Sequence, residues 1–292
     1  GLVGSEMCIR DSPYSGLLNA ILLGYRQEIL PETSKTFSQT GISHIVAISG
    51  LHITLITGIL FFIFLSLGIS RKKSFWPIVF VLFLYVLLIG FRASAIRAFI
   101  MSCALLYALK IGRLSKSLNA LVLSASCLLL INPNLILNDI GFQLSFLAVL
   151  GIMFFYPFFN SHFKIIPEKL QLRSIVCLTL SAQILTLPLI IYYFNTLSLI
   201  SPLSNLLILP ILPIIMIAGL CLIFFSFIWS KLALIFGVVV WLLLNYLLKI
   251  TTLLNSIPGA YFKLKSINFL WICSIYFIIF IFYLRYVKKP KN

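Results

Sequence analysis

Two histidines and two serines stand within one short stretch, Gly41–Leu55 (GISHIVAISGLHITL), which leads into a long apolar segment. On a helix, Ser49 and His52 are three residues apart and share a face, so they could act as nucleophile and base. No acidic residue lies nearby in the sequence to orient the histidine. His44 and His52 are eight residues apart, about 80° round and about 12 Å along a helix, whereas helical metal ligands usually stand four residues apart. A zinc site would therefore need a bend at Gly50, and we expect neither a catalytic nor a metal site here.

Polar side chains at membrane depth are costly unless they face a partner or a cavity. One interpretation is that neighbouring backbone or water satisfies the histidines. The other is that His44, Ser49 and His52 form a polar wall of a translocation path, with Gly50 allowing another helix to approach closely.

A second polar group lies in GFRASAIRAFIM, which spans Gly90–Met101. Arg92 can extend from a helix end to the interface. Arg97 lies about 7 Å deeper at helical rise, where an unpaired arginine costs at least a few kcal/mol. It should therefore pair inside the bundle, with Asp139 as the expected carboxylate, or contact a phosphate backbone.

The third group is INPNLILNDIGFQLSFLAVLGI, Ile131–Ile152. Asn138 or Asp139 is expected to cap a helix that starts there, because its side chain can accept hydrogen bonds from free backbone amides. Gln143 lies one turn beyond Asp139 on the same face, and Ser145 is a further polar residue in an apolar segment. These side chains could point to a lumen. Later polar residues such as Gln183 are explained equally well by hydrogen bonds between helices.

The elements that must position these residues are membrane-spanning helices. Hydrophobic residues make up 61% of the 292-residue chain and charged residues only 10%, and the mean hydropathy is +1.13, far from the values of a soluble domain. We therefore expect an all-α, polytopic integral membrane helix bundle with about nine transmembrane helices of roughly 20 residues. The expected spans lie near residues 45–68, 75–91, 93–109, 117–131, 140–159, 174–193, 203–228, 232–250 and 268–286.

Basic residues stand mostly in alternate loops, and the 22 Lys and Arg far outnumber the six Asp and Glu. Clusters follow the first, third, fifth and ninth expected spans, at Arg71–Lys73, Lys110–Lys116, Lys164–Arg173 and Arg285–Lys291. The positive-inside rule then places the start of the first span outside and the C-terminus in the cytoplasm. The net charge of +16 follows from this topology or from attraction to a polyanion.

Two features could alter this orientation. Lys263 and Lys265 would lie on the outer side, and Pro210 and Pro213 interrupt the seventh span. If that span is two half-helices or a re-entrant loop, every later segment is reversed.

The N-terminal 40 residues differ from the rest. Residues 1–12 (GLVGSEMCIRDS) lack a helical period and resemble translated adapter sequence, so we interpret them as a non-native leader of a fragment that begins near Pro13. Residues 13–40 are interpreted as an interfacial pre-helix region, in which Leu17, Leu18 and Ile21 recur at helical spacing and predict an interfacial amphipathic helix. The six cysteines stand singly without C-x-x-C spacing, which predicts no disulfide framework, metal or cofactor.

Together with the segment that starts at Leu17, these three groups resemble the competence domain of ComEC-type DNA uptake channels, and the resemblance covers most of residues 14–290. Within it, residues 41–290 are expected to form the transmembrane competence domain. The family's G-x-S-H-x-x-A-I-S-G-L-H, R-A-x-x-M and N-P-x-x-L-x-D-x-G-F-Q-L-S-F patterns are all present in order. The matching positions include Gly41, His44, Ser49, Gly50, His52, Arg97, Met101, Pro133, Asp139, Gly141, Gln143 and Ser145.

The resemblance implies that one strand of transforming DNA crosses the cytoplasmic membrane through this domain. It also implies single-stranded DNA and membrane lipids as partners, with a DNA receptor, a nuclease domain or subunit, a cytoplasmic ATPase and a second copy of the chain as further candidates. We expect the family's OB-like and metallo-β-lactamase-like domains to be absent from this chain, which contains no H-x-H-x-D-H pattern, and we expect no enzymatic activity. A small-solute or ion transporter that uses the His, Arg and Asp side chains remains an alternative, as does an intramembrane enzyme.

Overall fold

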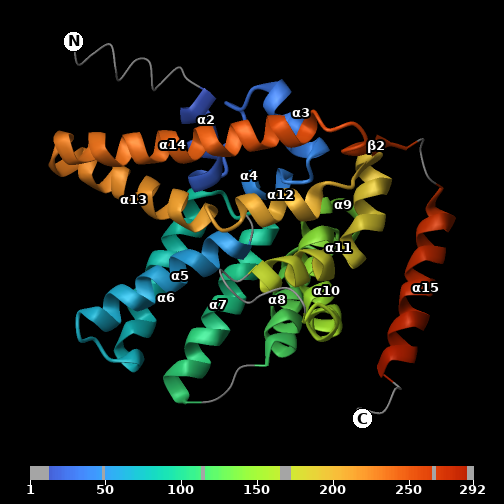
Figure 1. The fold of residues 1–292 in the computed structure, drawn as a ribbon. Coiled ribbons are helices and arrows are strands. Elements are labelled where there is room, and N and C mark those ends of the chain that lie inside the picture. Colours follow the sequence, from blue (N-terminus) through green and yellow to red (C-terminus); the bar gives the residue numbers. More distant parts are fainter. Residues whose placement is uncertain (1–12, 48–49, 113–115, 165–171, 265–267, 288–292) are drawn as a thin grey trace.

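Helices make up nearly all of the computed structural model, which describes residues 13–47, 50–112, 116–164, 172–264 and 268–287 (Figure 1). The expected all-α class is confirmed, with one small two-stranded sheet in addition. In chain order the first elements are α2 (Pro13–Leu23), α3 (Pro31–Gln39), α4 (Ser43–Val46), α5 (Gly50–Ser66), α6 (Arg71–Leu88), α7 (Ala93–Ile111), α8 (Ser117–Ile131) and α9 (Leu135–Asn138). They are followed by α10 (Ile140–His162), α11 (Leu172–Phe194), β1 (Thr196–Ser198), α12 (Ser201–Ile208), α13 (Leu212–Ile228), α14 (Ser230–Asn255), β2 (Tyr261–Lys263) and α15 (Phe269–Val287).

A helix lies in each of the nine segments expected to span the membrane, but nine crossings are not confirmed. Among the described residues, four helices are long and apolar enough to cross a membrane: α7, α10, α11 and α14. A fifth crossing is obtained if the bent pair α12 and α13 counts as one span. α5 and α8, with 17 and 15 residues, are shorter than the roughly 20 residues that a bilayer requires.

The seventh expected span is broken where the sequence allowed a break. α12 ends at Ile208, α13 begins at Leu212, and the two axes differ by 44°. Pro210 lies in the break, and Pro213 stands in the first turn of α13, where its missing amide hydrogen costs nothing. The prolines therefore explain a broken span or a re-entrant loop at this position.

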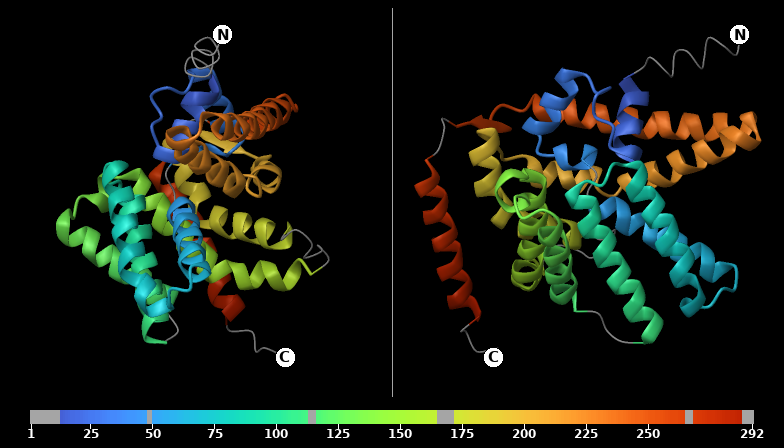
Figure 2. Two further views of the ribbon diagram at one scale, coloured as in Figure 1. Left: turned by 90° about the vertical axis from the view of Figure 1, so that its left-hand side faces the viewer. Right: turned by 180° about the vertical axis from the view of Figure 1, so that it is seen from behind.

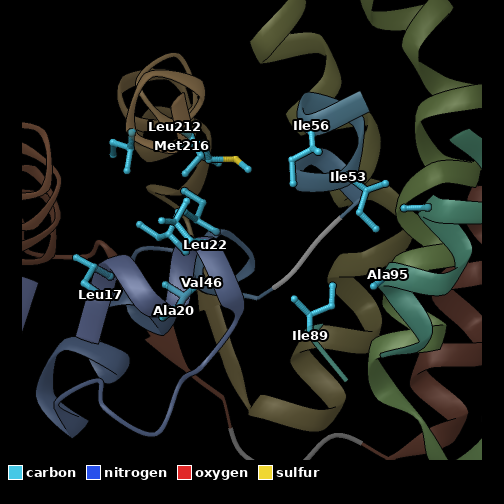
Figure 3. Packing of buried hydrophobic residues seen from close by; sticks show 14 of the residues in the cluster. Leu17, Ala20, Leu22, Val46, Ile53, Ile56, Ile89, Ala95, Leu212 and Met216 are labelled. Carbon is cyan, nitrogen blue, oxygen red and sulfur yellow. The ribbon is translucent and has the colours of Figure 1, made fainter. Parts of the chain in front are cut away.

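The helix expected on the membrane interface forms as α2, but it lies in the core of the bundle. Leu17, Ala20 and Leu22 are buried, and Figure 3 shows Leu22 facing Met216 of α13. Gly219 of α13 permits this approach, because a Cβ atom there would lie 2.9 Å from Cδ1 of Leu22. The interfacial position is not confirmed, because the apolar face of α2 is covered by protein.

The helices of the bundle do not share one direction. α13 and α14 pack side by side and extend across the top of Figure 1, whereas α7 and α15 run downwards. The two further views in Figure 2 show the same arrangement, with α15 at the edge of the molecule beside α11.

The small sheet was not expected from the sequence. Thr196 pairs with Lys263 and Ser198 with Tyr261, antiparallel, so residues far apart in the chain meet at the start of α12. The amides of Leu199 and Ile200 both donate to the Ala260 carbonyl, at 3.0 and 3.3 Å. These bonds fix the chain directly before the broken span.

Candidate functional site

Arg97 of α7 is the centre of the candidate site. Its side chain is buried, with 6% of its surface exposed. Nε donates a hydrogen bond of 2.7 Å to Oγ of Ser145 in α10, and one Nη atom lies 3.5 Å from the sulfur of Met101, one turn further along α7. The second and third polar groups of the sequence are therefore joined by a direct hydrogen bond.

The first polar group reaches the same arginine through Gly50, the first residue of α5. A Cβ atom at Gly50 would lie 2.9 Å from Nη2 of Arg97 and 3.6 Å from Cβ of Ala98. The absence of a side chain thus allows the first turn of α5 to contact the guanidinium. α5 and α10 both pack against α7, so three helices meet at Arg97.

Aromatic rings lie on the α10 side of the guanidinium. Cζ of Arg97 lies 5.8 Å from the ring centroid of Phe146, within the range of a cation–π interaction. The ring of Phe146 in turn contacts that of Phe142, with centroids 4.4 Å apart. Since serine, methionine and phenylalanine are neutral, these contacts leave the positive charge of Arg97 uncompensated.

Asp139 does not pair with Arg97, contrary to the carboxylate pairing considered above. Its Oδ1 accepts a 2.9 Å hydrogen bond from the amide of Phe142 and so caps α10. Gly141 leaves room for this cap, because a Cβ atom there would lie 3.0 Å from the same oxygen. The capping prediction for Asp139 is confirmed, and Pro133 lies in the turn between α8 and α9.

We expect Asp139→Asn to retain the cap and Asp139→Ala to lower the free energy of unfolding by about 1 kcal/mol, because asparagine accepts the same amide hydrogen bond. Thermal unfolding of the detergent-solubilised protein would measure both. Equal losses in the two variants would contradict the cap and indicate that the negative charge itself matters.

Gln143 connects helices instead of facing the arginine. Its Nε2 donates to the carbonyls of Ile136 and Leu137 at 2.6 and 3.2 Å, and its Oε1 accepts from the hydroxyl of Tyr193 in α11 at 3.2 Å. Gln143 and Ser145 are two residues apart, about 200° round a helix, so only one of them can face Arg97.

The residues of the first polar group are separated by a break. His44 is exposed on α4, Ala47 has an extended conformation that ends α4, and His52 is completely buried in α5. Ser49 lies outside the described residues, so its place beside His52 in a polar wall stays a prediction. No group of three metal-ligating side chains occurs in the part of the chain that the structure describes.

Gly41 connects this group to the broken span. It has a φ of +76°, and a Cβ atom there would lie 2.5 Å from both Cβ and Oγ of Ser201, the first residue of α12. Ser201 also accepts a 2.7 Å hydrogen bond from Nε2 of Gln183 in α11. Ser201 was not singled out from the sequence, although Pro202 beside it is a typical signal of a helix start.

Comparison with known proteins gives two relatives and one family. A family model described as "Competence protein" matches residues 21–290. The chain is 31% identical over 196 residues to ComE operon protein 3 of Bacillus subtilis (strain 168), which covers 67% of this chain and 24% of that protein. It is 24% identical over 228 residues to the uncharacterized protein YcaI of Escherichia coli (strain K12), over 73% of this chain and 29% of that protein. The chain thus spans about a quarter of the length of these curated relatives, and no solved structure matches it.

Proposed function

The chain belongs to the competence protein family, and from this membership we propose that it forms part of the path by which single-stranded DNA crosses the cytoplasmic membrane during natural transformation. The similarity to ComE operon protein 3 of Bacillus subtilis, over 67% of this chain, supports this direction. The ComEC-type sequence patterns described above support it further.

The observation that carries the proposal is the charge of Arg97, which pairs with no carboxylate among the described residues and lies over the ring of Phe146, itself in contact with the ring of Phe142. Single-stranded DNA is bound by positive charge along its phosphates and by aromatic faces on which bases stack. Arg97, Phe142 and Phe146 supply both kinds of group at one point of the bundle. An arginine buried only for structure would more often be paired with a carboxylate.

We propose the same membrane arrangement as the sequence predicts, with nine crossings in the inner membrane, the start of the first outside and the C-terminus inside. α12 and α13 would then cross as one broken span. The shorter helices α5, α8 and α15 would be accommodated by local thinning of the bilayer.

The proposal also includes partners. A phosphate-binding loop of the G-x-x-x-x-G-K-[ST] type does not occur in this sequence, so a cytoplasmic ATPase, or capture of the emerging strand, would supply direction. A DNA receptor would deliver the strand, and a nuclease domain or subunit would remove its complement.

Uptake of labelled DNA tests the proposal. A competent host that lacks its own channel gene would be complemented with the complete gene that encodes this chain, and DNA inside and outside the cell would be counted separately. We expect internalised DNA to be restored and surface-bound DNA to be unchanged. Normal surface binding without any internalisation would contradict the proposal, and pH-dependent solute uptake in the same cells would favour a transporter.

A further inference from the structure

Two arginines meet on one surface of the molecule. Arg92 stands five residues before Arg97 in the chain, and Arg26 lies in the loop after α2. Nη2 of Arg92 donates a 3.1 Å hydrogen bond to the carbonyl of Gly24, and Nε of Arg26 donates a 3.4 Å bond to the carbonyl of Val46. Both side chains are exposed. The two guanidinium groups are thus directed to the same small region by backbone oxygens.

Their charges lie close enough to influence each other. Desolvation of its guanidinium and, to a lesser extent, the charge of Arg92 lower the pKa of Arg26. The carbonyl acceptors are neutral and cancel neither charge. Glu28 is the carboxylate of the same loop, and its Oε2 accepts a 2.9 Å bond from the side-chain amide of Asn19. Two like charges held together in this way favour the binding of an anion with more than one negative group.

Each arginine has an exposed aromatic neighbour in the chain. Tyr25 is 52% exposed and Phe91 is 51% exposed. Phe91 has a φ of +50°, which is uncommon for a bulky residue, and its amide donates to the carbonyl of Val86. The ring of Phe91 contacts that of Phe83 in α6, with centroids 6.4 Å apart, and a strained backbone that holds a half-exposed ring at this position points to a binding role for it.

The loops that carry these residues are fixed to each other. The hydroxyl of Tyr85 in α6 donates a 2.7 Å bond to the carbonyl of Leu22 at the end of α2. In the hydrophobic cluster of Figure 3, Leu22 and Val46 lie on one side and Ile89, the residue after α6, on the other. Arg92 directly precedes α7, and Arg97 lies about 7.5 Å further along that helix at helical rise. A strand bound at the exposed arginines would therefore be about one and a half helical turns from the buried arginine.

We propose that Arg26 and Arg92, together with Tyr25 and Phe91, form the entrance that receives the single strand. The two guanidinium groups bind successive phosphates, because each can donate two hydrogen bonds to a phosphate, and the two rings stack on bases. This inference rests on the proposed function and names where the strand first binds. In the proposed topology both loops lie on the outer side, where arginines are not needed to orient helices.

The test is binding of a fluorescent single-stranded oligonucleotide to the purified full-length gene product over a range of salt concentrations. For single strands, the slope of log affinity against log salt changes by about 0.7 for each phosphate contact. We expect the double variant Arg26→Gln/Arg92→Gln to flatten the slope by about 1.4. Arg26→Gln alone, which breaks only the longer of the two backbone bonds, should flatten it by about 0.7.

Two further variants separate charge from stacking. Tyr25→Ala should lower affinity by roughly 5- to 150-fold without changing the slope, because stacking involves no counterion release. The control Lys35→Gln/Lys249→Gln removes two exposed charges from the same proposed side and should leave the slope as it is.

The outcomes distinguish this inference from the proposed function. An unchanged slope in the arginine variants, or an equal change in the lysine control, overturns the entrance. The proposed function would survive that result if loss of Arg97 still stops internalisation. A gene product that binds no strand and restores no uptake overturns both.

Discussion

Replacement of Arg97 by alanine should reduce internalisation of labelled DNA by roughly 5- to 150-fold, since each charged or stacked contact to a single strand is worth about 1–3 kcal/mol. The expected loss follows from the position of Arg97, where three helices meet and Ser145, Met101 and Phe146 leave its charge uncompensated. Surface-bound DNA should be unchanged, because the side chain is buried in the bundle.

Three companion variants show which property of Arg97 matters. Arg97→Lys keeps the charge but loses the planar guanidinium, so it should restore part of the uptake. Ser145→Ala removes the 2.7 Å hydrogen bond but not the charge and should have a smaller effect than Arg97→Ala. Lys110→Ala removes a cation that lies over Phe75 and Trp76 at the other end of the same helix and should leave uptake unchanged. If Arg97→Ala internalises DNA normally, Arg97 is not part of the path.

Gly41→Ala should strongly destabilise the fold, because Gly41, which lies just before α4, packs against Ser201, the first residue of α12. It places a side chain at a φ of +76° and within 2.5 Å of Ser201, so we expect a loss of about 2–5 kcal/mol in the free energy of unfolding. Titration with a denaturing detergent, followed by circular dichroism, would measure this loss.

Gly68→Ala is a matched control for that substitution. Gly68 has a φ of +75°, and no atom lies within 4 Å of the position that its Cβ would occupy. It should therefore cost only about 1–2 kcal/mol, the penalty of the left-handed conformation alone. Equal losses at Gly41 and Gly68 would show that the contact between Gly41 and Ser201 is absent in the folded protein.

Properties set by neighbours in the chain were predictable from the sequence. Apolar runs of sufficient length determine where helices form, Asp139 caps the helix that follows it, and Pro210 with Pro213 marks the broken span. Each of these depends on backbone groups only a few residues away, so the local order of residue types is enough to specify it.

Properties set by packing between distant helices were decided only by the tertiary structure. The sequence contains one obvious carboxylate for Arg97, yet the partner is Ser145, because Asp139 is already used by the amide of Phe142. Apolar spacing in α2 is the same for a helix on a lipid surface and for one in a core, and only the fit of Leu22 against Gly219 decides between them. Hydrophobic pattern and charge therefore identified a membrane-helix protein and its polar residues, whereas the contacts among those residues depend on which helices pack together.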